Sequence, residues 1–203
     1  MANVALIGAS GAVGSRILKE LSDRGHTVTG IARSPEKIAA LPGVTPRKGD
    51  VFDKEGLAEL IRDHDAVISA VHFVDSDPDT LIAAVRASGV KRYLVVGGAG
   101  SLEVAPGKRL VDTAEFPAIY KAEAQKGADF LDKLKTVSDL DWTFLSPSAM
   151  FVPGERTGKF RVGKDTLLAS DKGSSISFED YAIAMVDEIE KPTHVRQRFT
   201  VGY

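Results

Sequence analysis

One stretch decides the fold of this chain: Val4-Ala5-Leu6-Ile7-Gly8-Ala9-Ser10-Gly11-Ala12-Val13-Gly14. Val4 to Ile7 is a short apolar run typical of a buried strand, and a helical pattern follows from about Ala12 to Arg24. Three glycines between them allow a sharp turn and a close approach of the backbone to a pyrophosphate, whose negative charge would lie at the positive end of the helix. A turn that only packs tightly would need one glycine and not three. We therefore expect nucleotide phosphates to be bound by Gly8, Ser10, Gly11, Ala12, Val13 and Gly14.

Short β-branched runs alternate with helical stretches through the first two thirds of the chain, which predicts βαβ units. The expected strands are Val4–Ile7, Thr27–Ile31, Val44–Lys48, Ala66–Ala70, Tyr93–Val96 and Trp142–Leu145. The expected helices are Ala12–Arg24, Pro35–Ala40, Lys54–Arg62, Pro78 to a stop at Gly89, and Pro117–Thr136. Gly97 to Phe116 has no sustained period and is expected to be a long functional loop. The predicted fold class is α/β, a doubly wound parallel sheet of the Rossmann type.

The pattern changes to shorter pieces from about residue 150 onward. Lys159–Val162 and Thr166–Ala169 resemble the two strands of a hairpin. A helix near Phe178–Glu190 and a last strand at Arg198–Val201 follow them. We expect residues 150–203 to form a small C-terminal extension, a cap on the substrate side of one domain that spans residues 1–203.

Composition excludes several classes of function. The 203 residues include 26 Lys and Arg against 28 Asp and Glu, a net charge of −2, so the chain has no general attraction to nucleic acid. The absence of cysteine excludes thiol nucleophiles, disulfides and thiolate metal sites, and the four histidines show no metal-ligand spacing. No apolar run is long enough to span a bilayer, and no secretory signal is present. We expect a cytoplasmic protein that binds no metal, nucleic acid or membrane.

The end of the second expected strand indicates the cofactor. A nucleotide with a free ribose 2′-hydroxyl usually meets an acid about 20 residues beyond the glycines. The chain has Arg33 and Ser34 there, and no acid between Gly30 and Ser34. The Arg33 guanidinium can bind a 2′-phosphate through two hydrogen bonds, and Lys37 can assist it. The alternative is that Arg33 is a solvated surface residue that binds no ligand. The sequence therefore favours NADP(H), with NAD(H) as the alternative.

Several motifs together resemble one part of the short-chain dehydrogenase/reductase superfamily. The GxxGxxG spacing is similar to its extended and atypical branches, and essentially the whole chain resembles the group described as NADH-flavin reductases, which is related to NmrA-like proteins. The motifs that carry the resemblance are Gly8-Ala9-Ser10-Gly11, Arg33-Ser34-Pro35, Gly49-Asp50, Val95–Ser101, Asp141-Trp142-Thr143, Ile176–Ala182 and Arg198–Tyr203. The resemblance implies that Asp50 and Val51 lie beside the adenine ring and that the nicotinamide ribose is lined by Ser69, Ala70 and Val71.

Three side chains are candidates for catalysis. His72 follows the ribose-lining residues and could donate a proton or only pack. Ser101 falls near the catalytic Ser/Thr of the superfamily, with a simple turn role as the alternative. The superfamily activates a catalytic tyrosine with a lysine four residues later, but Ala124 stands four residues after Tyr120. Tyr120 is therefore better explained by close packing of a small-residue helix face against the sheet or another subunit.

The missing tyrosine–lysine pair favours a flat, conjugated hydride acceptor such as a flavin or a quinone. Such an acceptor delocalises the incoming charge and can take its proton from water, whereas an isolated ketone needs a placed acid. The expected function is an NAD(P)H-dependent oxidoreductase whose partner is a small-molecule electron acceptor, acting as a monomer or a homodimer. Two alternatives stay open: a non-catalytic NADP(H)-binding redox sensor of the NmrA type, and a sugar epimerase or carbonyl reductase.

Overall fold

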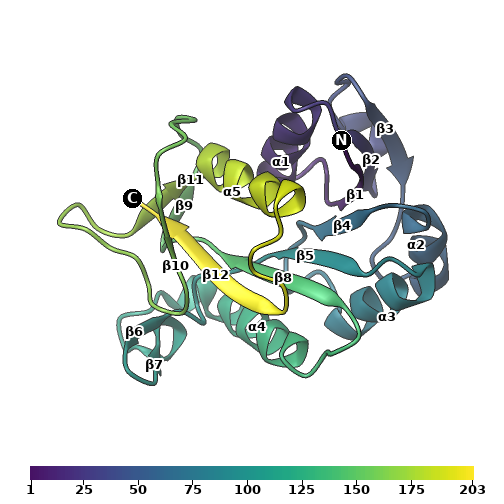
Figure 1. The fold of residues 1–203 in the computed structure, drawn as a ribbon. Coiled ribbons are helices and arrows are strands. Elements are labelled where there is room, and N and C mark those ends of the chain that lie inside the picture. The colour runs from purple at the N-terminus through teal and green to yellow at the C-terminus, as the bar shows by residue number, and fades with distance from the viewer.

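The computed structural model describes all 203 residues and contains one large sheet between two layers of helices (Figure 1). The strands of this sheet are β1 Asn3–Ile7, β2 Thr27–Ala32, β3 Val44–Lys48, β4 Ala66–Ser69, β5 Arg92–Val96, β8 Asp141–Ser146, β10 Arg161–Gly163 and β12 Gln197–Gly202. Their order across the sheet is β10-β12-β8-β5-β4-β1-β2-β3. All neighbours run parallel except β10, which pairs antiparallel with β12 at one edge. The predicted doubly wound α/β fold is confirmed.

Both faces of the sheet are covered by helices. The helices are α1 Ala12–Asp23, α2 Lys54–Ile61, α3 Pro78–Ser88, α4 Ala118–Leu134 and α5 Phe178–Glu190, with 3-10 turns η1 Pro35–Lys37 and η2 Leu110–Asp112. α1 and α5 pack together on one face, and α2, α3 and α4 cover the other (Figure 1). Alternate residues of β1 enter the two cores, with Val4 and Leu6 toward α1 and α5 and Ala5 and Ile7 toward the opposite layer. None of these helices has the length and apolar character that crossing a membrane requires.

The direction in which strands are added to the sheet reverses at β1. β2 and β3 extend the sheet on one side of β1, whereas β4, β5, β8 and β12 extend it on the other. The chain segments that leave β1 and β4 therefore diverge at the carboxyl edge, where ligands collect in doubly wound folds. The Ala70 N–H donates to the Ile7 carbonyl at 2.8 Å and keeps the two strand ends side by side.

The C-terminal quarter differs from its prediction. Lys159–Val162 and Thr166–Ala169 do not form a hairpin, because β10 pairs with β12 and Thr166 only bridges to Glu103. β12 lies parallel to β8 and offers an open edge, and this distant edge satisfies the backbone groups of β10. Residues 150–203 therefore supply two strands, β10 and β12, to the main sheet and one helix, α5, to its core, as well as the pieces outside it.

Two small sheets lie outside the main one. β9 Met150–Val152 pairs parallel with β11 Ser175–Ser177, which the sequence did not indicate. The expected loop 97–116 contains η2 and a hairpin of β6 Glu103–Ala105 and β7 Lys108–Arg109. Strands of two and three residues are too short to show an alternating apolar pattern, which explains why the sequence predicted only a loop.

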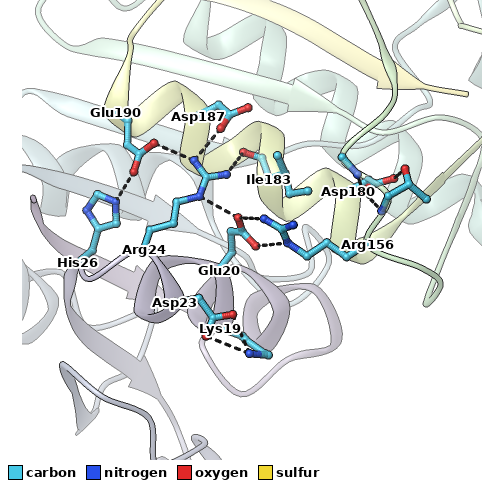
Figure 2. A network of polar contacts seen from close by, with 12 residues as sticks. Lys19, Glu20, Asp23, Arg24, His26, Arg156, Asp180, Ile183, Asp187 and Glu190 are labelled. Carbon is cyan, nitrogen blue, oxygen red and sulfur yellow. Dashed lines mark hydrogen bonds and ion pairs between the residues drawn. The ribbon is translucent and has the colours of Figure 1, made fainter.

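Charged side chains fasten α1 to α5 on the outer surface (Figure 2). Arg24 donates to Glu20 on its own helix and to Asp187 and Glu190 on α5, over 2.7–2.8 Å. Glu20 is only 4% exposed and also accepts from Arg156, which lies between β9 and β10. The Arg156 guanidinium, together with that of Arg24, holds the pKa of the Glu20 carboxyl below its usual range, although burial acts in the opposite direction.

Glu20→Gln is expected to lower the free energy of unfolding by about 1–3 kcal/mol near neutral pH, because a neutral amide is a weaker partner for two guanidinium groups. The pKa of the Glu20 carboxyl in the folded protein lies below the usual value of 4.5, so its contribution to stability is complete above about pH 4.5 and is lost as the pH falls further. Urea unfolding of both proteins from about pH 7 to about pH 3 measures this difference. Glu59→Gln, at an exposed partner of Arg62, is the control. A difference that is constant with pH contradicts the prediction.

Candidate functional site

Backbone contacts shape the turn between β1 and α1. The Gly8 and Ala9 N–H groups donate to the Ile31 carbonyl and tie the turn to β2. Gly8 has a φ of +85°, and a Cβ there would clash with the Ala70 carbonyl oxygen. A Cβ at Gly14 would likewise clash with the Gly8 carbonyl oxygen. The fold itself therefore requires Gly8 and Gly14.

Gly11 is different, because the protein does not require its lack of a side chain. It precedes α1 with an ordinary extended backbone, φ −73° and ψ 171°. A Cβ at Gly11 would come no closer than 3.3 Å to another atom, the Gly8 carbonyl oxygen. Ser10, Gly11 and Ala12 are all exposed at the carboxyl edge. A side chain at Gly11 would mainly fill the space in front of the helix, which points to a ligand there.

The amino terminus of α1 is uncapped. No side chain accepts a hydrogen bond from the N–H groups of its first turn, and that turn contains no acid. The N–H groups of Ala12, Val13 and Gly14 have no partner within the chain. By contrast, a side chain caps each of α2, α3 and α5. Free N–H groups at the positive end of a helix attract an anion, so the structure brings the predicted phosphate-binding residues together as an anion site.

Basic side chains lie beyond the ends of β2 and β3. Arg33 follows β2 directly, and Ser34 precedes η1. The strand register pairs Ala32 with Lys48, so Arg33 and Lys48 lie at the same edge of the sheet. Arg33, Lys37 and Lys48 are exposed and form no ion pair within the chain. This group of cations extends the anion site of α1 by one strand.

The turn after β3 carries Asp50 and Val51. The Asp50 carboxylate accepts the Phe52 N–H at 2.9 Å, and this turn leaves the Phe52 ring 61% exposed. The Gly49 N–H donates to the Ala32 carbonyl, so the turn lies beside the end of β2. Val51 packs partly against the core. Phe52 was not among the predicted site residues. An aromatic residue directly after a strand-end turn was a signal for it in the sequence.

The residues at the end of β4 do not all face the cleft. Ser69 is 2% exposed, and its hydroxyl lies 3.0 Å from the buried Tyr93 hydroxyl. The expectation that Ser69 lines the ribose is therefore wrong for its side chain, which points into the core because Tyr93 offers a buried polar partner. Ala70 and Val71 are half-buried at the sheet edge. Their contact with a ribose stays a prediction.

His72 lies next to an acid that the sequence analysis missed. Its side chain is 78% exposed, and its Nδ1 is 3.3 Å from a carboxylate oxygen of Glu123 on α4. Glu123 also accepts the Phe73 and Val74 N–H groups, each at 2.8 Å. A signal for this contact existed, because Glu123 begins a helical stripe whose other members are buried: Gly127, Phe130 and Leu134.

Ser101 is held in a buried polar network. It is 8% exposed, and its Oγ accepts a hydrogen bond from Arg198 at 3.0 Å. Arg198 lies on β12, on the side of β5 away from β1, and also donates to Ser146 and Asp165. The Ser101 hydroxyl therefore fastens the loop after β5 to β12. This position agrees with the structural alternative, and a catalytic role for Ser101 stays a prediction.

Tyr120 stands in the first turn of α4, 62% exposed, with no hydrogen bond from its side chain. Farther along the same face, a Cβ at Gly100 would lie 2.8 Å from the Ala124 Cβ. A Cβ at Gly127 would lie 2.7 Å from the Phe73 ring. The small residues therefore allow α4 to approach the loops after β4 and β5. Close packing explains Ala124 and Gly127, whereas Tyr120 lies outside that contact.

Gly11→Val is expected to abolish NADPH binding and to leave the fold intact, because its side chain would occupy the space in front of α1. Gly14→Val is the matched contrast and should destabilise the domain, since its side chain would clash with the Gly8 carbonyl oxygen. Circular dichroism with thermal unfolding reports the fold, and fluorescence titration with NADPH reports binding. Parent-like affinity in a folded Gly11→Val protein would refute the phosphate assignment.

Comparison with known proteins identifies the family. The NAD(P)H-binding family model matches residues 8–192. The uncharacterised YwnB protein of Bacillus subtilis is 44% identical, over 98% of this chain and 97% of its own length. A proposed epimerase of Bacteroides thetaiotaomicron is 44% identical with a TM-score of 0.94, over 99% of this chain and 96% of that one. A proposed NADH-flavin reductase of Streptococcus pneumoniae is 39% identical with a TM-score of 0.82, over 100% and 99%. The chain belongs to the NAD(P)H-binding family of Rossmann-fold proteins.

Proposed function

We propose that this protein is an NADPH-dependent reductase that passes hydride to a flat, conjugated acceptor such as a flavin or a quinone. The observation that carries the proposal is the uncapped amino terminus of α1 behind the exposed Gly11. The N–H groups of Ala12, Val13 and Gly14 would hold the pyrophosphate there. When bound, NADPH supplies the hydride from its nicotinamide ring.

The cations beyond β2 support a preference for the 2′-phosphate. Arg33 is exposed and unpaired, so its planar guanidinium is free to bind a phosphate by donating two hydrogen bonds to it. Lys37 and Lys48 add positive charge at the same edge. The first acid after β2, Glu36, comes only in η1 beside Lys37. The Streptococcus pneumoniae relative is named for NADH, so the preference for NADPH rests on Arg33 and its neighbours.

Exposed apolar side chains lie on three of the segments beyond the strand ends. Val74 follows β4, Tyr120 begins α4 and Met150 follows β8, and these side chains are 43%, 62% and 62% exposed. All three lie on segments that leave the carboxyl ends of strands, and exposed apolar side chains at a cleft favour a flat hydrophobic ligand. The proposed flavin reductase activity of the Streptococcus pneumoniae relative supports the same acceptor class.

NADPH is expected to bind about ten- to a hundredfold more tightly than NADH, because a charge-assisted contact to a phosphate contributes roughly 1.5–3 kcal/mol. Arg33→Ala should reduce this preference mainly by weakening NADPH binding. Calorimetric titration of both nucleotides at one salt concentration measures it. Arg62→Ala, at an exposed arginine at the end of α2 that pairs with Glu59, is the control and should leave the ratio unchanged. Equal affinities of the parent for the two nucleotides would overturn the preference.

The parent protein is expected to oxidise NADPH when a flavin or a quinone is added, which the loss of reduced-nicotinamide absorbance measures. Tyr120→Phe should retain this activity within about threefold, since a phenol without a lysine to activate it is a poor proton donor at neutral pH. Simple aldehydes and ketones should be poor substrates for both proteins. A loss of about a hundredfold in a folded, NADPH-binding Tyr120→Phe variant would instead favour a carbonyl reductase.

The same experiment separates the remaining alternatives. A redox sensor would bind oxidised and reduced cofactor with clearly different affinities and would reduce no acceptor. An epimerase, the activity proposed for the Bacteroides thetaiotaomicron relative, would retain its cofactor through turnover and interconvert sugar stereoisomers without net NADPH consumption. Stoichiometric NADPH consumption with a conjugated acceptor distinguishes the proposed reductase from both.

A further inference from the structure

Glu123 contacts both the backbone and the His72 side chain of the loop after β4. One carboxylate oxygen of Glu123 accepts the Phe73 N–H and also lies 3.3 Å from the His72 Nδ1, while the other accepts the Val74 N–H. The two backbone bonds would be sufficient to hold the loop against α4. The imidazole is an additional partner, and its orientation is set by the same carboxylate.

The second ring nitrogen of His72 is free. Glu123 is the partner of Nδ1, and no group of the chain contacts Nε2. The side chain is 78% exposed and lies three residues beyond the end of β4, the strand beside β1. Hydrogen bonds of catalytic groups are often long before a substrate is bound, so a separation of 3.3 Å is compatible with a working pair.

We infer that His72 is the proton donor to the reduced acceptor and that Glu123 is its positioning residue, an inference that rests on the proposed reductase function. Hydride addition brings two electrons and one hydrogen nucleus to the acceptor, which becomes an anion. The Nε2–H bond of the His72 imidazolium then breaks, and its proton forms a new bond to the negative heteroatom of the acceptor. The neutral imidazole regains a proton from water.

Glu123 contributes to this step without touching the acceptor. Its carboxylate accepts a hydrogen bond from Nδ1–H, which orients the ring and directs Nε2–H away from α4. The contacts to Phe73 and Val74 fix the backbone on which the imidazole is carried. A flavin or a quinone can take this proton from water, and the pair delivers it faster than water does.

A double-mutant cycle tests the inference with NADPH and riboflavin as the assay substrates. His72→Ala should lower kcat by about a hundredfold with little change in the KM for NADPH, the size expected for loss of a general acid. Glu123→Ala should lower kcat similarly, and the double variant should be no worse than His72→Ala, because Glu123 acts through His72. Losses that multiply would show that Glu123 acts independently of His72 and would overturn the inference.

Two further measurements distinguish a chemical role from a structural one. Free imidazole should restore part of the turnover of His72→Ala and less of that of the double variant, because the carboxylate also orients the added imidazole. Asp129→Ala removes an exposed carboxylate from the same helix, one that accepts only from Gln125, and should match the parent in kcat. Parent-like kcat in His72→Ala, with no response to imidazole, would overturn the donor role.

Nitrogen-15 NMR tests the pairing without turnover. In the parent, the neutral His72 imidazole is expected as the Nδ1–H tautomer, and Glu123→Ala should shift it toward Nε2–H; the signal missing from His72→Ala assigns the residue. An Nε2–H tautomer in the parent would refute the pairing itself. A different result would be a parent protein that shows the Nδ1–H tautomer and binds NADPH but reduces no acceptor. That result would overturn the reductase proposal and the donor role of His72, and it would leave the His72–Glu123 contact confirmed.

Discussion

The rest of the structure depends on one backbone contact, in which Gly8 lies against the Ala70 carbonyl oxygen with no room for a Cβ. The Ala70 N–H bonds to the Ile7 carbonyl at the same point, and Gly14 brings α1 down onto Gly8. The backbone therefore passes too close for a side chain to fit at the point where β1 and β4 end and α1 begins. This convergence directs the amino terminus of α1 toward the open carboxyl edge of the sheet.

The two ends of α1 use charge in opposite ways. Its amino end has neither a cap nor an acid, so its N–H groups stay available to an anion. At the other end, Arg24 joins Glu20 to two carboxylates of α5, and Arg156 adds a second guanidinium to Glu20. The Glu20 carboxylate is buried between the two guanidinium groups, whereas Asp187 and Glu190 lie at the surface. The network therefore fixes α1 against α5, and this fixes the direction in which the free end points.

α4 organises the acceptor side through close packing. Ala124 lies against Gly100, and Gly127 lies against the Phe73 ring, so the helix can approach the loops after β5 and β4. Only at this short distance does Glu123 reach the backbone and imidazole of the loop after β4. The small residues that first suggested a mere packing face are thus the reason that a charged group of α4 reaches the loop after β4.

The sequence by itself determined the parallel sheet, its main helices and the glycine turn, because apolar runs, helical periodicity and glycine positions are local signals. It also indicated Arg33 as the candidate 2′-phosphate ligand, because that prediction depends only on the position of Arg33 directly after β2. The remaining features needed tertiary structure, since their partners are distant along the chain. Ser69 turned inward to Tyr93, Ser101 was engaged by Arg198, and β10 paired with β12 instead of its neighbour. Glu123 met His72 only because α4 packs against the loop after β4, a contact between side chains 51 residues apart. The helical stripe of α4 marks the face on which Glu123 lies, but it does not identify His72 as the partner.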